Sequence, residues 1–154
     1  MAIEAVRTYL KEWGRDKDII ELEESSATVE LASQALGVIP ARIAKTLSFK
    51  TEEGCVIIVV AGDKKVDNKK YKAEFGCKAK MLTPEEAEEL TGHAVGGVCP
   101  FANPEGAKVY LDVSLKEYET VFPACGSGNS AIQLTCDELE TYSRCLKWVD
   151  VCKD

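Results

Sequence analysis

Two adjacent stretches decide the fold of this chain: Ile43-Ala44-Lys45-Thr46-Leu47-Ser48-Phe49 and Cys55-Val56-Ile57-Ile58-Val59-Val60-Ala61. The first alternates apolar and polar residues at its start, which is typical of a β-strand. The second is a continuous run rich in β-branched residues, and such a run predicts a central strand buried on both faces. Residues 51–54 between them predict the turn of a β-hairpin.

The remaining segments mix helices with short strands. Apolar periodicity and capping residues predict helices over 2–13, 29–36, 67–75 and 84–91, with a last helix that opens at Thr135. Shorter runs predict strands over 18–22, 78–82, 107–112, 119–124 and 130–134, with a helical turn at 114–117. Because these elements do not repeat as βαβ units, we expect an α/β fold of the α+β kind, with helices around a mixed, barrel-like sheet.

Length and composition predict one soluble domain over residues 1–154. A chain of 154 residues can bury a substantial core, and 45% apolar with 29% charged residues is ordinary for a globular protein. No run approaches the roughly 18 apolar residues that a membrane span needs. The first residues are amphipathic and include an early acid, Glu4, so they do not resemble a signal peptide. We therefore expect a cytoplasmic protein that does not bind membranes.

Cysteine and histidine usage argues against a metal site. The chain has seven cysteines and one histidine, and no two cysteines stand as C-x-x-C. Zinc sites and thioredoxin-like motifs need closer spacings than these. Reduced thiols that pack as small apolar groups fit a cytosolic chain better, and we expect no metal and no other cofactor.

Charge is distributed unevenly along the chain. The net charge of −7 argues against a protein that binds nucleic acid by bulk attraction. Residues 64–80 nevertheless carry seven lysines against two acidic residues. This segment is either a solvated helix face or the place where an anionic backbone docks. The lysines that we expect to contact such a backbone, if the second interpretation holds, are Lys64, Lys65, Lys69 and Lys70.

Glycine and proline are concentrated in Gly96-Gly97-Val98-Cys99-Pro100-Phe101, shortly after His93. Two glycines allow a tight turn and the close approach of another molecule. Pro100 fixes one φ angle and removes one N–H group, which leaves the other amides of the loop to point at a polar carbonyl. A surface turn between two elements explains the same composition. Both interpretations stay open at this point.

Four further features have two interpretations each. Lys45 is either a solvent-facing strand residue or a cation for a phosphate or a developing oxyanion. His93 is either a general base or a residue that faces the dipole at a helix C-terminus. Cys99 would be a nucleophile only if its pKa were lowered, and packing as a small apolar group is favoured. The loop Gly126-Ser127-Gly128-Asn129-Ser130 lacks the lysine of a phosphate-binding loop, so a plain hairpin turn is favoured over a nucleotide site.

Four segments follow the order and spacing of one known family: Ile43–Leu47, Thr91-Gly92-His93, Gly96–Phe101 and Gly126–Leu134. On these segments the chain resembles the YbaK/prolyl-tRNA-synthetase-associated domain family, and the resemblance covers nearly its whole length. The family contains freestanding aminoacyl-tRNA deacylases and the related editing insertion of bacterial prolyl-tRNA synthetase. A lysine in the first strand together with the G-x-x-x-P loop, here Gly96 to Pro100, is quite specific.

The resemblance implies hydrolysis of the ester that joins a wrong amino acid to the 3′ adenosine of a tRNA. It implies tRNA(Pro) as the tRNA, prolyl-tRNA synthetase as a partner, and no metal. In the family, the lysine that matches Lys45 is essential and holds the terminal phosphate or polar groups, while the G-x-x-x-P backbone holds the aminoacyl carbonyl. The implied catalytic residues are Lys45, Gly96, Gly97 and Pro100. The implied substrate-binding residues are Thr46, His93, Val98, Cys99, Phe101, Gly126, Ser127 and Asn129.

The chain departs from the family pattern at two positions. Some members carry a serine and an aspartate near the ester, where the nearest residues of this chain are Ala124 and Ala131. A mechanism specific for cysteinyl esters would depend on those groups. We therefore expect the chain to represent another subgroup.

Three hypotheses about function remain at this stage. The leading one is a freestanding trans-editing deacylase, in which replacement of Lys45 abolishes hydrolysis without unfolding the protein. The alternative is a non-catalytic module that binds tRNA or the synthetase through the lysines of segment 64–80. The third is a thiol hydrolase that uses Cys99, which alkylation would inactivate.

Overall fold

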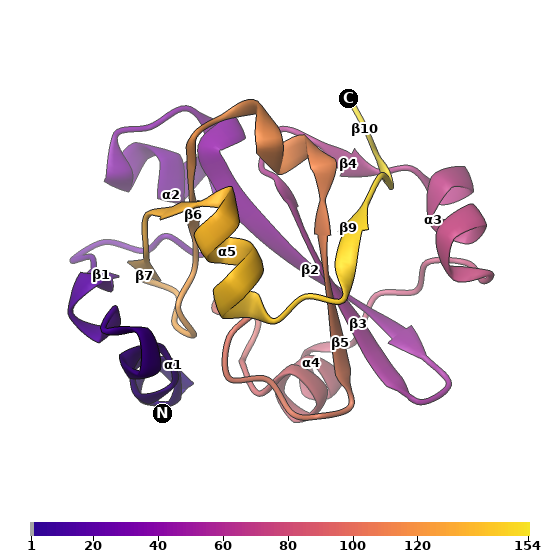
Figure 1. Ribbon diagram of the computed structural model, residues 1–154, viewed down its shortest axis with the longest axis horizontal. Helices are drawn as coiled ribbons and strands as arrows, with labels where there is room; N and C mark the ends of the chain where they lie inside the picture. The colour runs from indigo at the N-terminus through magenta and orange to yellow at the C-terminus, as the bar shows by residue number, and fades with distance from the viewer. Residues whose placement is uncertain (1) are drawn as a thin grey trace.

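The structure is a computed structural model that describes residues 2–154. A strongly twisted sheet of six strands, in the order β8–β6–β2–β3–β5–β9, forms its centre as a half-barrel (Figure 1). The fold predicted from the sequence, a mixed barrel-like sheet with helices around it, is confirmed. The strands of this sheet are β2 (Ile43–Thr51), β3 (Gly54–Ala61), β5 (Ala107–Asp112), β6 (Thr120–Pro123), β8 (Leu134–Thr135) and β9 (Lys147–Val149).

The β2–β3 hairpin is the longest pairing in the sheet. Its register runs from Ala44 opposite Ala61 to Thr51 opposite Gly54, as the sequence predicted. β3 also pairs in parallel with β5, so both edges of β3 are hydrogen-bonded. The residues of β3 from Cys55 to Ala61 are all buried, because helices and loops cover both faces of this central strand.

Five α-helices lie around the sheet within residues 2–154, as Figure 1 shows. Capping residues define their starts: the Thr83 and Thr135 side chains form capping boxes with Glu86 and Glu138, and Asp67 accepts from two amides of the next turn. The helices are α1 (Ala2–Leu10), α2 (Val29–Leu36), α3 (Asn68–Phe75), α4 (Pro84–Thr91) and α5 (Cys136–Ser143). Short 3-10 helices occupy Lys11–Trp13, Asp16–Asp18, Pro40–Arg42 and Val113–Glu117.

The two faces of the β2–β3 hairpin pack into different parts of the core. Val59 belongs to a cluster that contains residues of α1, β6 and α5, whereas Val60 packs with Tyr71 of α3 and with Val151 near the C-terminus. On β2, Thr46 is opposite Val59 and Lys45 is opposite Val60. Because side chains alternate along a strand, Lys45 and Thr46 therefore face opposite sides of the sheet.

Several predicted boundaries need correction. The predicted helix 2–13 ends at Leu10 and continues as a 3-10 turn, and the predicted strand 18–22 shortens to β1 (Ile20–Glu21). The prediction of a strand over 78–82 is wrong, because only Met81 forms an isolated bridge, with Phe49. The predicted strand 130–134 is interrupted: β7 (Ser130–Ala131) pairs with β1, and β8 pairs with β6.

Two short strands lie in segments where no strand was expected from the sequence. β4 (Lys65–Val66) pairs with β10 (Cys152–Lys153), so the C-terminal segment is fixed beside the lysine-rich segment.

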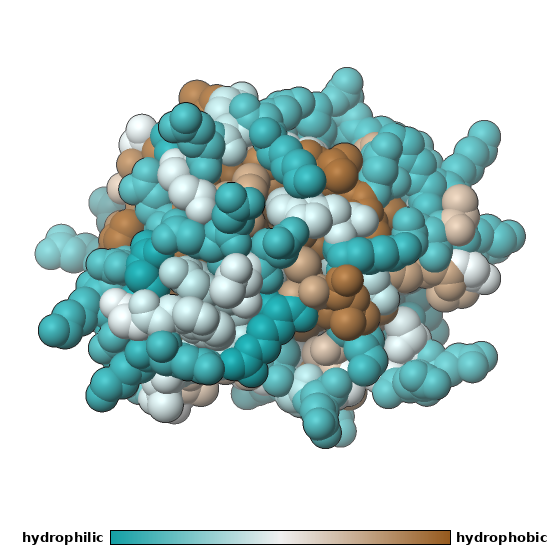
Figure 2. Space-filling view, in the orientation of Figure 1, coloured by the Kyte–Doolittle hydropathy of each residue, from teal (hydrophilic) through white to brown (hydrophobic). Residues whose placement is uncertain are grey.

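Hydrophilic side chains cover most of the face in Figure 2, and apolar side chains show there only in small groups. Within residues 2–154, the helices lack the length and apolar character needed to cross a membrane.

Candidate active site

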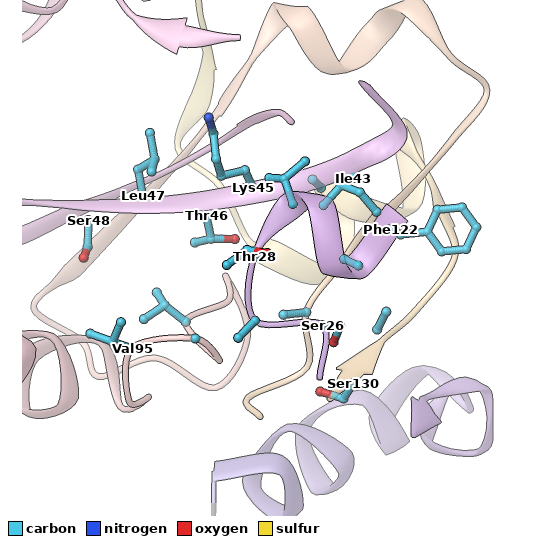
Figure 3. Close-up of a pocket in the computed structure, with 18 of the residues that line it drawn as sticks. Ser26, Thr28, Ile43, Lys45, Thr46, Leu47, Ser48, Val95, Phe122 and Ser130 are labelled. Atoms are coloured by element: carbon cyan, nitrogen blue, oxygen red, sulfur yellow. The ribbon is translucent and has the colours of Figure 1, made fainter. Parts of the chain in front are cut away.

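A cavity of about 390 Å³ lies beside β2 (Figure 3). Its walls come from segments that are far apart in the sequence: the chain that leads into α2, strand β2, the loop 95–98, and the strands β6 and β7. Part of its lining, which we call the deep side, is apolar and mostly buried, with Ala32 and Leu36 of α2, Ile43 of β2 and Phe122 of β6. This volume exceeds the roughly 150 Å³ of a cavity that holds benzene, so the space can take an amino-acid side chain together with a further group.

The cavity lies where the outer edge of β2 is unpaired. On that edge, β6 pairs only with Ile43 and Ala44, and the next contacts are hydrogen bonds of Ser48 and Lys50 with the chain at 80–82. Backbone groups of alternate residues point to the same side of a strand, so the N–H and C=O of Thr46 face this open edge. The Thr46 hydroxyl is also buried without a hydrogen-bond partner among residues 2–154. The structure thus leaves polar groups of Thr46 available beside the cavity.

Lys45 extends away from the cavity interior. Figure 3 shows its side chain on the opposite side of β2 from Thr46, Ser26 and Ser130. Its half-buried ammonium donates to the backbone carbonyl of Lys64, 2.7 Å away. Burial lowers the pKa of Lys45, and a bound anion would favour its charged form. Lys45 still contributes to the cavity wall, so it lies at the rim where the cavity passes over the edge of β2.

The Gly-rich loop faces the cavity with alternate residues. Gly96 and Val98 line the cavity, whereas Gly97, Cys99 and Pro100 are buried and do not. The Gly97 amide donates to the Ala94 carbonyl over 2.9 Å and closes a turn, so it is not free for a ligand. The amides of Gly96 and Val98 have no acceptor within residues 2–154. Of the implied carbonyl-binding loop, the donors available beside the cavity are therefore the amides of Gly96 and Val98, and the Gly97 amide is used within the loop.

Gly97 packs against the backbone of a second loop. A Cβ atom on Gly97 would lie 2.7 Å from both Gly126 C and Ser127 N. Gly126 in turn has φ +93°, and a Cβ there would lie 2.9 Å from the backbone of Ala2. The two loops and the start of α1 therefore stack without side chains between them, which only glycine permits.

The loop 126–130 supports one wall of the cavity from behind. Leu22 and Asn129 exchange hydrogen bonds, and the Ser26 amide donates to Gly128 O over 2.7 Å. Ser127 donates to Ser130 within the loop. Gly126, Ser127 and Asn129 do not line the cavity, contrary to the pocket role that the family resemblance implies for them.

His93, Cys99 and Phe101 lie beneath the Gly-rich loop, in the core. His93 Nε2 is 2.7 Å from the Phe101 carbonyl and 3.4 Å from Cys99 Sγ. Burial lowers the pKa of His93, so the neutral imidazole donates to that carbonyl. Burial also raises the pKa of the Cys99 thiol to about 12, which counts against a thiolate nucleophile. None of the three side chains lines the cavity.

Asn103, to which the sequence assigned no role, ties the loop to α4. Its Nδ2 donates to Thr91 O over 2.8 Å and to Cys99 O over 3.0 Å. Both amide protons are used, so one side chain fixes the start and the end of the segment that carries Gly96 and Val98. The sequence shows Asn103 only as part of an Asn-Pro turn, which gives no sign of this contact.

We expect Asn103→Ala to lower stability by about 1–3 kcal/mol, because two carbonyls lose their donor. Asn103→Asp should be worse, since a carboxylate oxygen would then face those two carbonyls. Urea unfolding measures the loss, and a catalytic assay should show kcat reduced more than KM is raised. Asn68→Ala is the matched control, because α3 contributes nothing to the cavity. An Asn103→Ala protein with unchanged stability and kcat would contradict this role.

The sequence did not predict that the segment before α2 forms a wall of the cavity. Ser26, Ala27 and Thr28 line the cavity, but the sequence indicated only a polar loop and a helix cap there. It also missed Met81 and Val95, which line the cavity while 60% and 66% exposed. The sequence gives no signal for either residue, because their exposure is visible only in the fold.

Ala124 and Ala131 both line the cavity. They are the two positions at which the sequence departs from the pattern of the resembled family. The lining of the cavity is apolar at both.

The lysine-rich segment is partly neutralised. Lys64 forms an ion pair with Asp154, and Lys70 with Asp150 at 3.2 Å. Lys65 and Lys69 are exposed and have no ion pair within the described residues. Lys45 hydrogen-bonds to the Lys64 carbonyl, so the rim of the cavity and the lysine-rich segment are adjacent.

Residues 2–154 contain no cluster of side chains suited to a metal ion.

The chain is similar to known proteins over most of its length. The aminoacyl-tRNA editing domain family matches residues 23–142, which contain every residue that lines the cavity. The uncharacterized protein YwhH of Bacillus subtilis (strain 168) is 55% identical over 155 residues, covering 100% of this chain and 99% of YwhH. The proline–tRNA ligase of Exiguobacterium sibiricum is 30% identical over 130 residues, covering 82% of this chain and 22% of the ligase, so the chain spans about a fifth of that protein.

A solved structure has the same fold along its whole length. The crystal structure of a proposed trans-editing enzyme for prolyl tRNA synthetase matches with a TM-score of 0.88 and 30% identity, and the match covers 99% of this chain and 98% of that one. Family match, overall fold and cavity therefore lead to one conclusion. The chain belongs to the aminoacyl-tRNA editing domain family, which is the YbaK/prolyl-tRNA-synthetase-associated family that its motifs resemble.

Proposed function

We propose that this protein is a freestanding trans-editing deacylase that hydrolyses the ester of a mischarged tRNA, with tRNA(Pro) as its tRNA. One observation carries the proposal: Gly96 and Val98, whose amides have no acceptor within residues 2–154, line the same cavity as Thr46 at the open edge of β2. Backbone donors fixed in this way can hold a carbonyl and stabilise the oxyanion that develops on it.

The chemistry demands little of the side chains. An aminoacyl ester is already activated, so hydrolysis needs a positioned ester, an oriented water and a stabilised oxyanion. In the proposed arrangement the ester carbonyl accepts from Gly96 and Val98. The unpartnered Thr46 hydroxyl and the open backbone of β2 orient the attacking water. Water adds to the carbonyl, and the ribose oxygen leaves with a proton.

Lys45 acts as an anchor for the phosphate of the terminal nucleotide. Its ammonium lies on the other side of β2 from the cavity interior, which favours phosphate binding over contact with the oxyanion (Figure 3). The exposed Lys65 and Lys69 provide further positive charge next to the rim. Lys64 and Lys70 contact the tRNA as well, once its phosphates displace their ion-pair partners Asp154 and Asp150. Because the net charge is −7, these contacts are confined to the lysine-rich segment, and prolyl-tRNA synthetase supplies additional tRNA affinity.

The cavity favours a small, uncharged amino acid. Its deep side carries Ala32, Ile43, Phe122 and Ala131, and its interior offers hydroxyls but no carboxylate to pair with a charged side chain. Prolyl-tRNA synthetase must exclude residues larger than proline at its own site, so a second pocket that admits small residues would act as a sieve. This role places the protein in the cytoplasm, where tRNA is charged.

A matrix of mischarged tRNAs tests the proposal. We expect hydrolysis of tRNA(Pro) that carries a small amino acid, with alanyl-, cysteinyl- and seryl-tRNA(Pro) assayed first. Correctly charged prolyl-tRNA(Pro) and alanyl-tRNA(Ala) are the controls and should be hydrolysed at least about tenfold more slowly, as a size-selective pocket and a tRNA preference require. Release of the amino acid from radiolabelled substrate gives the rates.

Absence of hydrolysis across the matrix would refute the deacylase proposal. Measured tRNA binding would then decide whether the alternative, a non-catalytic binding module, holds. Binding through the lysines of segment 64–80 must weaken as salt is raised, because phosphate contacts release counterions. Binding that does not respond to salt would exclude such contacts.

A further inference from the structure

Two exposed apolar side chains flank the mouth of the cavity. Met81 is 60% exposed and Val95 is 66% exposed, and both line the cavity that also contains Gly96 and Thr46. They come from different segments: Met81 bridges to Phe49 at the outer part of β2, and Val95 precedes the Gly-rich loop. Exposed apolar residues that gather at a cavity entrance, rather than singly on the surface, mark a binding surface.

The position of the ester fixes what must lie near these side chains. If Gly96 and Val98 hold the ester carbonyl, the groups joined to the ester lie close to Val95, which is next to Gly96 in the chain and exposed at the cavity. Consecutive Cα atoms are about 3.8 Å apart, so the group joined to the ester is within contact distance of Val95. The apolar deep side takes the amino acid, and the cavity has room for a second group.

The surroundings of Met81 suit a nucleotide. The exposed Lys78 and Lys80 precede it, and Lys50 hydrogen-bonds through its amide to the Lys80 carbonyl. Single-stranded nucleic acid binds where positive charge follows the backbone and flat or polarizable side chains contact the bases. The methionine sulfur makes favourable contacts with aromatic rings, and the valine methyls add a second apolar surface in the same cavity.

We propose that Met81 and Val95 form a nucleobase clamp, which holds the terminal adenine of the tRNA at the mouth of the cavity. This inference rests on the proposed function for the identity of the ligand. It assigns the apolar mouth to the base and leaves only the deep side to the amino acid. The clamp positions the ester against the Gly96 and Val98 amides and adds affinity that a free amino-acid ester lacks.

NMR titration with adenosine 5′-monophosphate tests the clamp without requiring catalysis. The ring current of the base should shift the Met81 and Val95 methyl signals, and ribose 5-phosphate, which lacks the base, should not. Leu146, which is 60% exposed and outside the cavity, provides the control methyl signals. Absence of these shifts at saturating nucleotide, or equal shifts with ribose 5-phosphate, would overturn the clamp.

Kinetics give the second measurement. Met81→Ser/Val95→Ser should reduce kcat/KM on mischarged tRNA by about tenfold, mainly through KM, as expected for loss of base stacking. Hydrolysis of the matching amino-acid ethyl ester should not change, and Leu146→Ser should change neither. Equal loss on the ethyl ester would instead assign the two residues to the amino acid. If the methyl shifts appear while wild-type protein hydrolyses no tRNA ester, the clamp stands and the deacylase proposal fails.

Discussion

Lys45→Met should reduce kcat/KM for deacylation of mischarged tRNA by about 10- to 100-fold, the cost of one hydrogen bond to a charged group. Methionine keeps the aliphatic stem that packs beside β2 but removes the ammonium at the rim of the cavity. The hydrogen bond to the Lys64 carbonyl is also lost, but this contact is only partly buried. We therefore expect circular dichroism and the thermal midpoint to remain close to wild type.

The substrate series separates the two roles that a lysine at this position can have. If Lys45 holds the terminal phosphate, Lys45→Met loses activity on tRNA but keeps it on an amino-acid ethyl ester. If Lys45 instead stabilises the oxyanion, both substrates lose activity equally. Lys50→Met is the matched control, because Lys50 is on the same strand, pairs with Glu86 and does not line the cavity. Full activity of Lys45→Met on mischarged tRNA would remove Lys45 from the mechanism.

Gly97→Ala should both destabilise the protein and inactivate it. The new Cβ would lie 2.7 Å from two backbone atoms of the neighbouring loop, so the loops must separate. Overpacking of this kind costs about 1–3 kcal/mol, which lowers the thermal midpoint of a domain of this size by about 2–10 °C. The shift would also move Gly96 and Val98, and a misplacement of about 1 Å costs about 100-fold in rate.

Gly106→Ala is the control for Gly97→Ala. A Cβ on Gly106 would meet its nearest atom, Glu53 O, at 3.9 Å, which is ordinary contact. Differential scanning calorimetry and the deacylation assay should therefore find this variant close to wild type. If Gly97→Ala loses activity while its thermal midpoint is unchanged, the glycine is needed to make room for the substrate and not for the packing of the two loops. Wild-type values for both measurements would mean that the loop contact does not position the site.

Local patterns predicted the elements that depend on neighbouring residues. The β2–β3 hairpin follows from alternation, a β-branched run and a turn, and the helix starts at Thr83 and Thr135 follow from capping boxes. Short strands were less predictable, because β1, β4, β7 and β10 have two residues each and exist only through their partners. The stretch 78–82 has strand-like composition, but just one residue in it bridges to β2.

The candidate site was predicted in part. Lys45, Thr46, Gly96 and Val98 line the cavity, as the motifs implied. The other implied substrate-binding residues, such as His93 and Ser127, lie behind the wall and hold it in place. A motif does not distinguish residues that contact the ligand from residues that support the loop, because the site needs both.

The sequence by itself determined the hairpin, the helix starts, the family and the residues that form the Gly-rich loop. Each of these depends on composition and spacing within one segment. Only the tertiary structure decided that the Gly97 amide is occupied, that Lys45 and the cavity interior lie on opposite sides of β2, and that Met81 and Val95 share one entrance. These facts depend on which distant segments pack together, because pairing and burial determine which polar groups remain free for a ligand.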